Sequence, residues 1–498
     1  MKAKIAAILL AAVLLISALA ACSGSDGSSG AETVAAGADT AETEAAETTT
    51  ARLTADVPDS DFGGYEFTFL ARGKKNNWEN YEFEIDQLDG DVINDALYER
   101  NSKISDELNI TFKHERVDGY DVNTPFTKAV LSGEDIYDVA LPSITDAGKY
   151  AQSGYLVPLQ DLKYMDLEKP WYDARCIEEL KINGKNYLFF SDITVRNLDA
   201  IWIYCFNKQY IEDFNLDEPY DLMAAGTWTM DNMTAMCKAV MSDVNGDGLM
   251  DKSDRWGLVA HDYVITAGYI GSGERIATAA KDGSISLTMN NQRIYEVIDS
   301  LIGLQDYWIR YSLTAKKYSA AAPVGFEPSD NYAELIGVFK AGSALFCGEV
   351  LAVMSDMRDS DIDFGVVPTP KLNEKQDGYY SAVNYIAAAM VIPLTATDLD
   401  RTSIVIESLA AESHYTVIPA YYEIAMKSKY ARDLITSDML DLIFDSRSYD
   451  LGIYYGWGDL SARFCSLVYE ASTDFASMYD ANKSAAEEAL NKFVEQFS

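Results

Sequence analysis

The stretch Asp243–Asp254, DVNGDGLMDKSD, has oxygen-bearing residues at the spacing of a calcium-binding loop. Counted from Asp243, side-chain oxygens fall at positions 1, 3, 5, 9 and 12, and position 7 offers a backbone carbonyl. Gly248 occupies position 6, where such a loop must turn sharply. We therefore predict a structural Ca²⁺ site with the ligands Asp243, Asn245, Asp247, Leu249, Asp251 and Asp254.

The loop departs from the usual pattern at position 12, where Asp254 replaces glutamate. The shorter side chain would lower the affinity for the ion. The alternative is a polar turn held by hydrogen bonds from side chains to the backbone. We expect a helix over 226–241 before the loop and a strand at 255–259 after it, so the ion would stabilise a surface turn rather than operate a paired sensor.

Signatures of catalysis are missing from the sequence. Its three histidines, His114, His261 and His414, lie in no HExxH motif and beside no Cys ligand, so we expect structural or surface roles for them. GxSxG, GxxxxGK[ST] and GxGxxG motifs are also missing. With 78 acidic residues, any pair of carboxylates can be chosen freely, so the pattern singles out no glycosidase centre. We assign no catalytic residue.

The N-terminus has the pattern of an export signal. Two lysines precede an uncharged apolar run, Ile5–Ala21, which is short for a membrane span. The last residues of this run and the next one, Leu19–Cys22, resemble a bacterial lipobox, which implies a signal peptide over 1–21 and lipidation of Cys22. The alternative is an ordinary signal peptide followed by a chance cysteine.

The segment 22–61 has no aromatic residue and no apolar periodicity, so we expect a lipidated cysteine followed by a disordered tether. The folded body should begin near Phe62. It is long enough for two domains or two lobes. The net charge of −38 would repel nucleic acid, which excludes it as a partner.

Five cysteines remain beside Cys22, at wide spacing and without a CxxC motif. We expect most of them to be small buried residues rather than a disulfide framework or a metal cluster. This pattern favours a Gram-positive or anaerobic source over an oxidising periplasm.

Strands and helices alternate along the first part of the body. YEFTFLAR at 65–72 and ITFKHERV at 110–117 should be strands, and the apolar face of 92–108 predicts a helix between them. A helix around 126–132 should precede a short apolar strand in YDVALPS. This order predicts α/β layers around a largely parallel sheet.

The last predicted element is a helix over SAAEEALNKFVEQFS. Ser484 and Glu487 have the spacing of a capping box, and Leu490, Phe493 and Phe497 share one face that should pack against the body.

Five motifs resemble the extracellular solute-binding proteins of ABC importers, family 1, the group that contains maltose-binding protein. In chain order they are YDVALPSITDAGKYAQSGYLVPLQDL, IWIYCFNKQYIEDFNL, GTWTMDNM, FKAGSALFCGEV and DFGVVPTPK. Each motif is weak alone, but the shared order makes chance agreement improbable. The segment 74–91 does not match the family pattern and could reshape the cleft.

The resemblance implies an α/β, two-lobed periplasmic-binding-protein-like fold of type II, with discontinuous lobes and a ligand cleft between them. It implies a first lobe at 62–197 plus 381–414 and a second lobe at 198–380 plus 415–498. It also implies a lipid-anchored monomer on the outer face of the cytoplasmic membrane that delivers a carbohydrate, foremost an oligosaccharide, to the permease subunits of an ABC importer.

Three alternatives stay open. The chain could be an exported carbohydrate-active enzyme that uses paired carboxylates, a binding protein for a non-sugar solute such as a peptide, or an adhesion module built around the calcium loop. The last would require repeats, and the sequence has none.

A sugar cleft needs aromatic rings for stacking and polar groups for hydroxyls, and the chain has 32 Tyr and 7 Trp. The family contacts its ligand after strand ends and beside the crossings between lobes. Carried over to this chain, these places predict the ligand-binding residues Trp78, Ser143, Asp192, Arg196, Trp228, Glu349, Tyr379, Tyr380, Asn384 and Trp457. For Trp228, packing of the helix end is the alternative role.

Overall fold

The structure is a computed structural model that describes residues 52–73, 79–117, 121–311, 332–357, 360–422 and 434–497. Trp78, Cys22 and the predicted signal peptide lie outside these ranges. Among the described residues, no helix combines the length and the apolar character that a membrane span requires.

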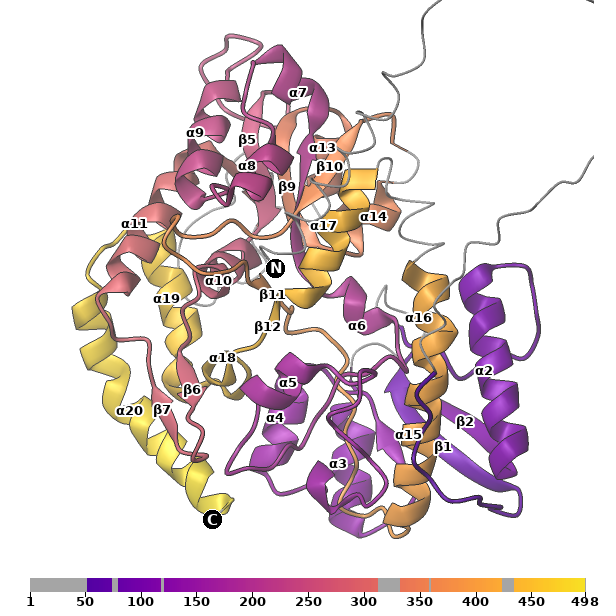
Figure 1. The fold of residues 1–498 in the computed structure, drawn as a ribbon. Helices are drawn as coiled ribbons and strands as arrows, with labels where there is room; N and C mark the ends of the chain where they lie inside the picture. The colour runs from indigo at the N-terminus through magenta and orange to yellow at the C-terminus, as the bar shows by residue number, and fades with distance from the viewer. Residues whose placement is uncertain are drawn as a thin grey trace, which may run out of the picture. The chain divides into compact units, whose positions relative to one another are not determined.

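The smaller of the two main sheets is built near the start of the chain (Figure 1). β1 (Tyr65–Arg72) lies between β2 (Ile110–Val117) and β3 (Val139–Ala140), and both pairings are parallel. Phe67 and Phe69 of β1 are fully buried and form the centre of the apolar core beneath this sheet. The predicted strands at 65–72 and 110–117 are confirmed.

Helix α2 (Val92–Leu108) connects β1 to β2, as the apolar periodicity predicted. The carboxylate of Asp91 begins the helix by accepting hydrogen bonds from two backbone N–H groups of its first turn. Leu97 and Ile104 are buried on its inner face. The next helix, α3 (Asn123–Ser132), begins slightly earlier than predicted.

A later part of the chain returns to the smaller sheet. The backbone N–H of Ala140 donates to the carbonyl of Val391 at 3.0 Å, and that of Phe189 donates to Met390 at 3.1 Å. Helix α15 (Leu399–Tyr415) then packs against α2. The body around this sheet is therefore built from two separate parts of the sequence. We call it the first body.

The larger sheet has five strands in the spatial order β10 (Phe364–Val367), β4 (Trp202–Asn207), β9 (Ala344–Val350), β5 (Trp256–His261) and β8 (Trp308–Tyr311). β5 is parallel to β9 and β8, whereas β4 is antiparallel to both of its neighbours. The largely parallel sheet expected from the first part of the body is confirmed by β1, β2 and β3, whereas the larger sheet is mixed.

Helices surround the larger sheet to form the second body (Figure 1). Every residue of α10 (Tyr263–Gly271) is buried, because this helix packs against β5, β11 (Ser381–Ala382) and two neighbouring helices. Other helices of this body are α9 (Met230–Val240), α11 (Arg293–Leu304), α17 (Leu434–Asp445) and α19 (Leu460–Tyr469).

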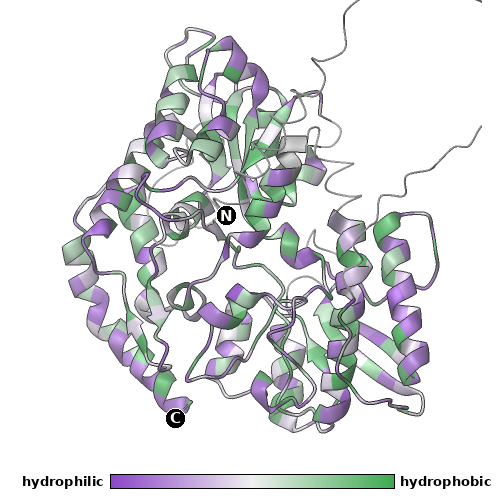
Figure 2. Ribbon diagram, in the orientation of Figure 1, coloured by the Kyte–Doolittle hydropathy of each residue, from purple (hydrophilic) through white to green (hydrophobic). Residues whose placement is uncertain are grey.

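The last helix, α20 (Phe475–Gln496), is longer than predicted, and hydrophilic and hydrophobic residues alternate along it in Figure 2. The predicted N-cap, Ser484, is wrong because it lies inside the helix. Asp474 caps the helix instead, and its carboxylate accepts a hydrogen bond from the N–H of Ser477 at 3.2 Å. Leu490 and Phe493 are buried, as their shared face predicted.

The packed chain starts earlier than Phe62. Ala55 and Val57 pack against the core of the first body, and the N–H of Leu53 donates to the hydroxyl of Tyr415 at 2.8 Å. The residues before Phe62 therefore run along the first body toward the end of α15. The lobe boundaries given above stay predictions.

The five cysteines after Cys22 are free thiols. Cys176, Cys205, Cys237 and Cys347 are buried, and Cys465 is partly buried. The expectation of small buried residues is confirmed for four of them. Burial raises the pKa of the Cys465 thiol to about 11, which keeps it protonated and unreactive at neutral pH.

The carboxyl group of Glu407 on α15 provides a test of this fold. It is 1% exposed, and it accepts a hydrogen bond from the hydroxyl of Tyr172 at 2.6 Å. Burial raises its pKa to about 7, so folding favours the protonated form. The protonated carboxyl group of Glu407 therefore contributes fully to the free energy of unfolding below the unfolded pKa near 4.5. This contribution is lost as the pH rises to about 7.

We predict that Glu407→Gln makes the protein less sensitive to this pH change. Between pH 5 and pH 8, the wild type should lose up to about 3 kcal/mol of unfolding free energy that the variant keeps, measured by urea denaturation. Asp400→Asn, at an exposed residue of the same helix, is the control and should keep the wild-type pH dependence. Equal pH dependence in Glu407→Gln and the wild type would contradict the assignment.

Candidate functional site

The predicted calcium loop connects α9 to β5, so the expected helix and strand are confirmed. Backbone hydrogen bonds between Ser242 and Arg255, at 2.9 and 3.0 Å, close the base of the loop. Gly246 and Gly248 have φ angles of 73° and 82°. These left-handed conformations favour glycine and produce the sharp turn expected at Gly248.

Carboxylates of the loop accept hydrogen bonds from its own backbone. Asp243 accepts the N–H groups of Gly246 and Gly248 at 2.6 and 2.9 Å. Asp254 accepts those of Asp251 and Val244, both at 2.9 Å, and these bonds lower its pKa. The side-chain oxygens of the loop are the ligand atoms that Ca²⁺ prefers. In the described residues, however, no three His, Cys, Asp or Glu side chains lie close enough together to hold a metal ion.

A second region lies where the parallel strands of both sheets end. β5 and β9 end at His261 and Val350, while β1 and β3 end at Arg72 and Ala140. In open α/β sheets, ligands bind outside the carboxyl ends of parallel strands. The residues that follow these four strands are therefore candidates for a ligand site.

A cavity of about 130 Å³ is lined by residues from the edges of both sheets. Tyr81 comes from the segment after β1, Leu351 follows β9, and Arg196 precedes β4. The residues lining the cavity are Tyr81, Ile93, Val195, Arg196, Asp199, Leu351, Ala352, Met354, Ser355 and Tyr421. Arg196 is a predicted ligand-binding residue, and the structure places it in this wall.

The polar groups of the cavity are partly engaged with one another. Arg196 Nη1 lies 3.0 Å from Asp199 Oδ2, and the hydroxyl of Tyr421 donates to Asp199 Oδ1 at 2.7 Å. Burial raises the pKa of Asp199, and Arg196 opposes that shift. The guanidinium of Arg196 also lies 5.6 Å from the centre of the Tyr81 ring, within range of a cation–π contact.

One polar atom of this wall has no hydrogen-bond partner. In the part of the chain that the structure describes, Arg196 Nε is buried and unpaired. Buried donors are almost always satisfied in native proteins, by protein, water or ligand. A donor, a carboxylate and an aromatic ring therefore meet at one concave surface, an arrangement suited to hydroxyl groups carried on an apolar ring.

The predicted residue Glu349 lies at the end of β9 as half of a buried pair. Its carboxylate is 3.2 Å from His261 Nε2, and Glu349 is only 2% exposed. Burial lowers the pKa of His261, but the carboxylates of Glu349 and Asp262 outweigh this effect and raise it to about 10. The indole of Trp202 lies edge-on to the imidazole with ring centres 5.1 Å apart.

Two predicted residues of the first body have local partners. Ser143 caps α4 (Ile144–Gln152), where its hydroxyl accepts the N–H of Asp146 at 3.1 Å. Asp192 lies 2.6 Å from Nδ1 of His414, at the end of α15. The structure places neither residue in the wall of the cavity.

Two predicted aromatic residues lie beside cations. The Tyr380 ring is flanked by the guanidinium groups of Arg175, at 5.7 Å, and Arg275, at 5.4 Å. The Tyr379 ring lies 5.3 Å from the ammonium of Lys371. In the described residues, cationic side chains of the protein therefore lie over the faces of both rings.

Three further predicted residues are buried. Trp228 is 0% exposed, and its indole N–H donates to the carbonyl of Pro368 at 2.9 Å, which agrees with the packing alternative. Trp457 is 1% exposed and stacks on Tyr455. Asn384 is 3% exposed and lies in the returning crossing segment. The ligand roles of these residues stay predictions, as does that of Trp78.

The comparisons with known proteins bear on the fold. No protein-family model and no curated protein matches the chain. Among solved structures, it is similar to the cyclic α-maltosyl-1,6-maltose binding protein of Arthrobacter globiformis, with a TM-score of 0.54, 15% identity, and 87% of this chain and 100% of that chain covered. This chain has the fold of a solute-binding protein.

Two further solved structures agree. A cyclo/maltodextrin-binding protein complexed with maltotetraose has a TM-score of 0.55 at 12% identity and covers 87% of this chain and 97% of its own. An ABC transporter solute-binding protein from Agrobacterium radiobacter K84, in complex with ribitol, has a TM-score of 0.51 at 14% identity and covers 87% and 100%. The predicted two-lobed type II fold is confirmed.

Sequence reasoning missed several groups at the junction of this solute-binding fold. Tyr81 lies in the segment that matched no family pattern, so no motif indicated it. Asp199 lies three residues after Arg196, a spacing that brings side chains together on one helical turn and could have indicated the pair. Tyr385, 40% exposed beside Asn384, was also missed, because a sequence does not show which aromatic rings are exposed.

We predict that Glu349→Gln destabilises the protein by about 3 kcal/mol at pH 6, because it leaves a buried imidazolium without its counterion. The folded pKa of His261 is raised, so the stabilisation is complete below pH 6.5 and is lost as the pH rises to about 10. Urea denaturation at pH 6, 8 and 10 should show this loss shrinking with pH. The exposed change Glu374→Gln is the control. A destabilisation that is independent of pH would overturn the assignment.

Proposed function

We propose that this chain is the substrate-binding protein of an ABC importer, which captures a carbohydrate between its two lobes and delivers it to membrane permease subunits. The cavity at the junction of the two bodies is the observation that carries this proposal. Its Arg196, Asp199 and Tyr81 offer a donor, an acceptor and a ring face together, and the fold is that of proteins solved with maltotetraose and ribitol.

The size of the cavity supports capture by closure. Ligand pockets generally enclose about 300–1,000 Å³, whereas this cavity has about 130 Å³. A sugar would therefore bind while the two bodies stand farther apart, and closure would bring groups from both bodies onto it. Closing on a ligand is how a solute-binding protein presents a conformation that a permease can distinguish. No bond of the sugar is broken.

The solved neighbours named above are binding proteins, which favours this function over the enzyme alternative. One of them was solved with an oligosaccharide and one with a polyol, so we propose an oligosaccharide as the first ligand class and a polyol as the second. A peptide ligand has no observation in its favour. An enzyme would produce a new sugar species, whereas a binding protein returns the sugar unchanged.

We also propose the location of the protein. The signal peptide at 1–21 would direct export, and lipid on Cys22 would hold the protein outside the cytoplasmic membrane of a Gram-positive cell. Residues from Leu53 onward pack along the first body, which supports a tether that ends before Leu53. The permease would meet a monomer that can rotate about this tether.

Arg196→Gln tests the site. The change removes a charge-assisted donor from the cavity, so we predict an affinity for the bound sugar about tenfold lower or worse, measured by isothermal titration calorimetry. Arg463→Gln, at an exposed arginine of α19, is the matched control and should bind like the wild type. Chromatography of the sugar after incubation should recover it unchanged. Wild-type affinity in Arg196→Gln, or a new sugar product, would contradict the proposal.

We further propose that Ca²⁺ stabilises the Asp243–Asp254 loop. Its all-oxygen donor set and the left-handed turns at Gly246 and Gly248 support a hard cation. The ion would be held by Asp243, Asn245, Asp247, Asp251 and Asp254 with the carbonyl of Leu249. Its role would be to hold the connection between α9 and β5.

Calcium should raise the melting temperature of the protein and chelator should lower it, because the ion binds only the folded loop. Asp247→Ala should abolish this response, since it removes a central carboxylate ligand. Asp231→Asn, at an exposed carboxylate of α9, is the control and should respond like the wild type. A wild-type melting temperature that is the same with calcium and with chelator would leave the polar-turn alternative.

A further inference from the structure

Two of the five free thiols face each other within the larger sheet. Cys205 of β4 and Cys347 of β9 are directly opposed in the antiparallel pairing of these strands. Directly opposed residues point to the same face of a sheet, and both side chains are 0% exposed in the same apolar core. The other three cysteines, Cys176, Cys237 and Cys465, pack in or against a different core. Cys205 and Cys347 are therefore the two thiols that the fold brings together.

The register of this pairing sets the separation of the two backbones. The N–H of Leu351 donates to the carbonyl of Ile201 at 2.8 Å, and antiparallel pairs alternate between hydrogen-bonded and non-hydrogen-bonded ones. Because Cys205 and Cys347 lie an even number of residues from that pair, they are a hydrogen-bonded pair too. The Cα atoms of such a pair lie about 5.5 Å apart, and disulfides most often join Cα atoms about 5.5–6 Å apart.

The two Cβ atoms must move closer for a disulfide to form. Opposed residues have Cβ atoms about 4.5–5.5 Å apart, whereas a disulfide holds them about 3.5–4.5 Å apart. A relative shift of β4 and β9 by about 1 Å is therefore enough. A disulfide formed with such a shift is strained and more easily reduced than a relaxed one, so we expect a reversible link.

Burial determines when this bond can form. The thiolate is the form of cysteine that attacks a disulfide, and burial raises the pKa of both thiols. β4 and β9 each have a neighbouring strand on both sides, so an oxidant in solution does not reach either sulfur in the folded protein. Oxidation must therefore take place while the chain folds, before the larger sheet is complete.

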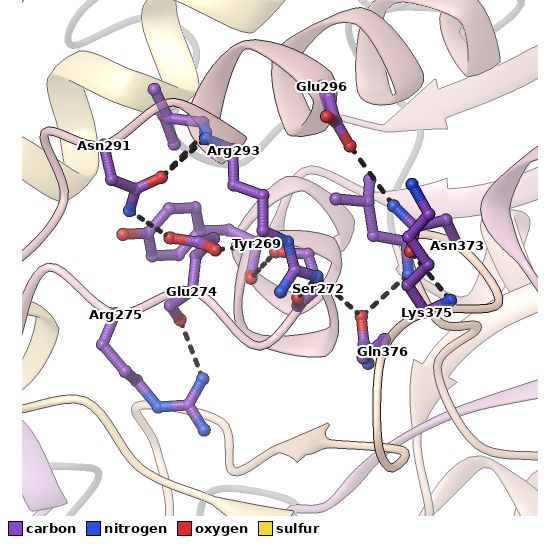
Figure 3. Close-up of polar contacts among 12 residues, drawn as sticks. Tyr269, Ser272, Glu274, Arg275, Asn291, Arg293, Glu296, Asn373, Lys375 and Gln376 are labelled. Atoms are coloured by element: carbon purple, nitrogen blue, oxygen red, sulfur yellow. Dashed lines mark hydrogen bonds and ion pairs between the residues drawn. The ribbon is translucent and has the colours of Figure 1, made fainter.

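A bond at this place would join the two ends of a long loop. The loop from Cys205 to Cys347 holds β5, α9, α10 and α11. Contacts within the loop connect neighbouring parts of it: in Figure 3, Arg293 donates to the carbonyl of Ser272 at 2.7 Å, and Asn291 donates to Glu274 at 2.5 Å. A disulfide across a long loop restricts the unfolded chain most, so this link would stabilise the second body.

We propose that Cys205 and Cys347 are a disulfide site, which a disulfide-bearing oxidant oxidises as the exported chain folds and which stabilises the second body. One cysteine thiolate attacks a sulfur of the oxidant, which breaks the S–S bond of the oxidant and releases one thiol. The second cysteine thiolate attacks this mixed disulfide, forms the bond between Cys205 and Cys347 and releases the other thiol. The two cysteines lose two protons and two electrons, which the two released thiols gain.

The oxidising surroundings rest on the proposed export, whereas the pairing of the two thiols does not. The test therefore supplies export and oxidant itself and uses no sugar. The chain from Cys22 onward is directed to a bacterial periplasm by a signal peptide of the host, once in a host with its thiol oxidase and once in a host without it.

A disulfide map of the wild type decides whether the bond forms. Free thiols are alkylated in denaturant before digestion. From the oxidising host we expect the peptides of Cys205 and Cys347 to be joined, and from the other host we expect both cysteines to be alkylated. Alkylated Cys205 and Cys347 from the oxidising host, or a bond from either one to another cysteine, would overturn the proposal.

The melting temperature tests what the link does. Wild type from the oxidising host should melt about 5 °C or more above wild type from the other host. The double variant Cys205→Ala/Cys347→Ala should lose this difference. Cys176→Ala/Cys237→Ala, at two cysteines of the other core, is the matched control and should keep it. No difference in the wild type, or a difference that persists without Cys205 and Cys347, would overturn the proposal. Where a double variant does not fold, the map of the wild type still decides.

Discussion

The structure depends on the contact between two chain segments that cross from one body to the other. Ile201 pairs with Val383, and the N–H of Asn384 donates to the carbonyl of Ala200 at 2.9 Å. This contact sets the point at which β4 enters the larger sheet and the point at which the returning segment enters the smaller one. It therefore aligns the carboxyl edges of the parallel strands of both sheets around one junction.

Several features of the junction follow from this alignment. Arg196 and Asp199 lie just before the first crossing, and their ion pair faces Tyr81 from the first body. The buried pair of His261 and Glu349 lies at the adjacent ends of β5 and β9. Charged groups at this depth are tolerated because each has an opposite charge in contact. A concave, polar and aromatic surface results where the ends of the two sheets meet.

The sequence predicted the regular parts of the fold because those depend on local patterns. The alternation in Tyr65–Arg72 and the apolar face of Val92–Leu108 are enough to specify a strand and a helix. The loop after α9 was located from residue spacing alone. The antiparallel direction of β4 was not predicted, because it is a matter of its pairing with β9 and β10, which lie far away in the sequence. The N-cap of α20 was misplaced because Asp474 and Ser484 both precede helix-forming residues.

The site was predicted less completely than the fold. Arg196 was predicted because it lies beside a crossing, a position that the family order indicates, and the structure places it in the cavity wall. Trp228 and Trp457 have the residue type that stacks on sugars, but tertiary packing buries them, and residue type cannot reveal burial. Tyr81 was missed because it lies in a segment without any recognisable motif. Which side chains face a cleft depends on how two bodies meet, and that is a long-range property.

The most direct test of this account is a crystal structure of the exported protein with the sugar that binds it most tightly. We predict one sugar molecule in the enlarged cavity at the junction, with Arg196 and Asp199 bonded to its hydroxyls, Tyr81 against a ring face, and residues of both bodies in contact with it. A sugar bound to one body alone, or away from Arg196, would contradict the central claim that the two bodies close on a carbohydrate at this junction.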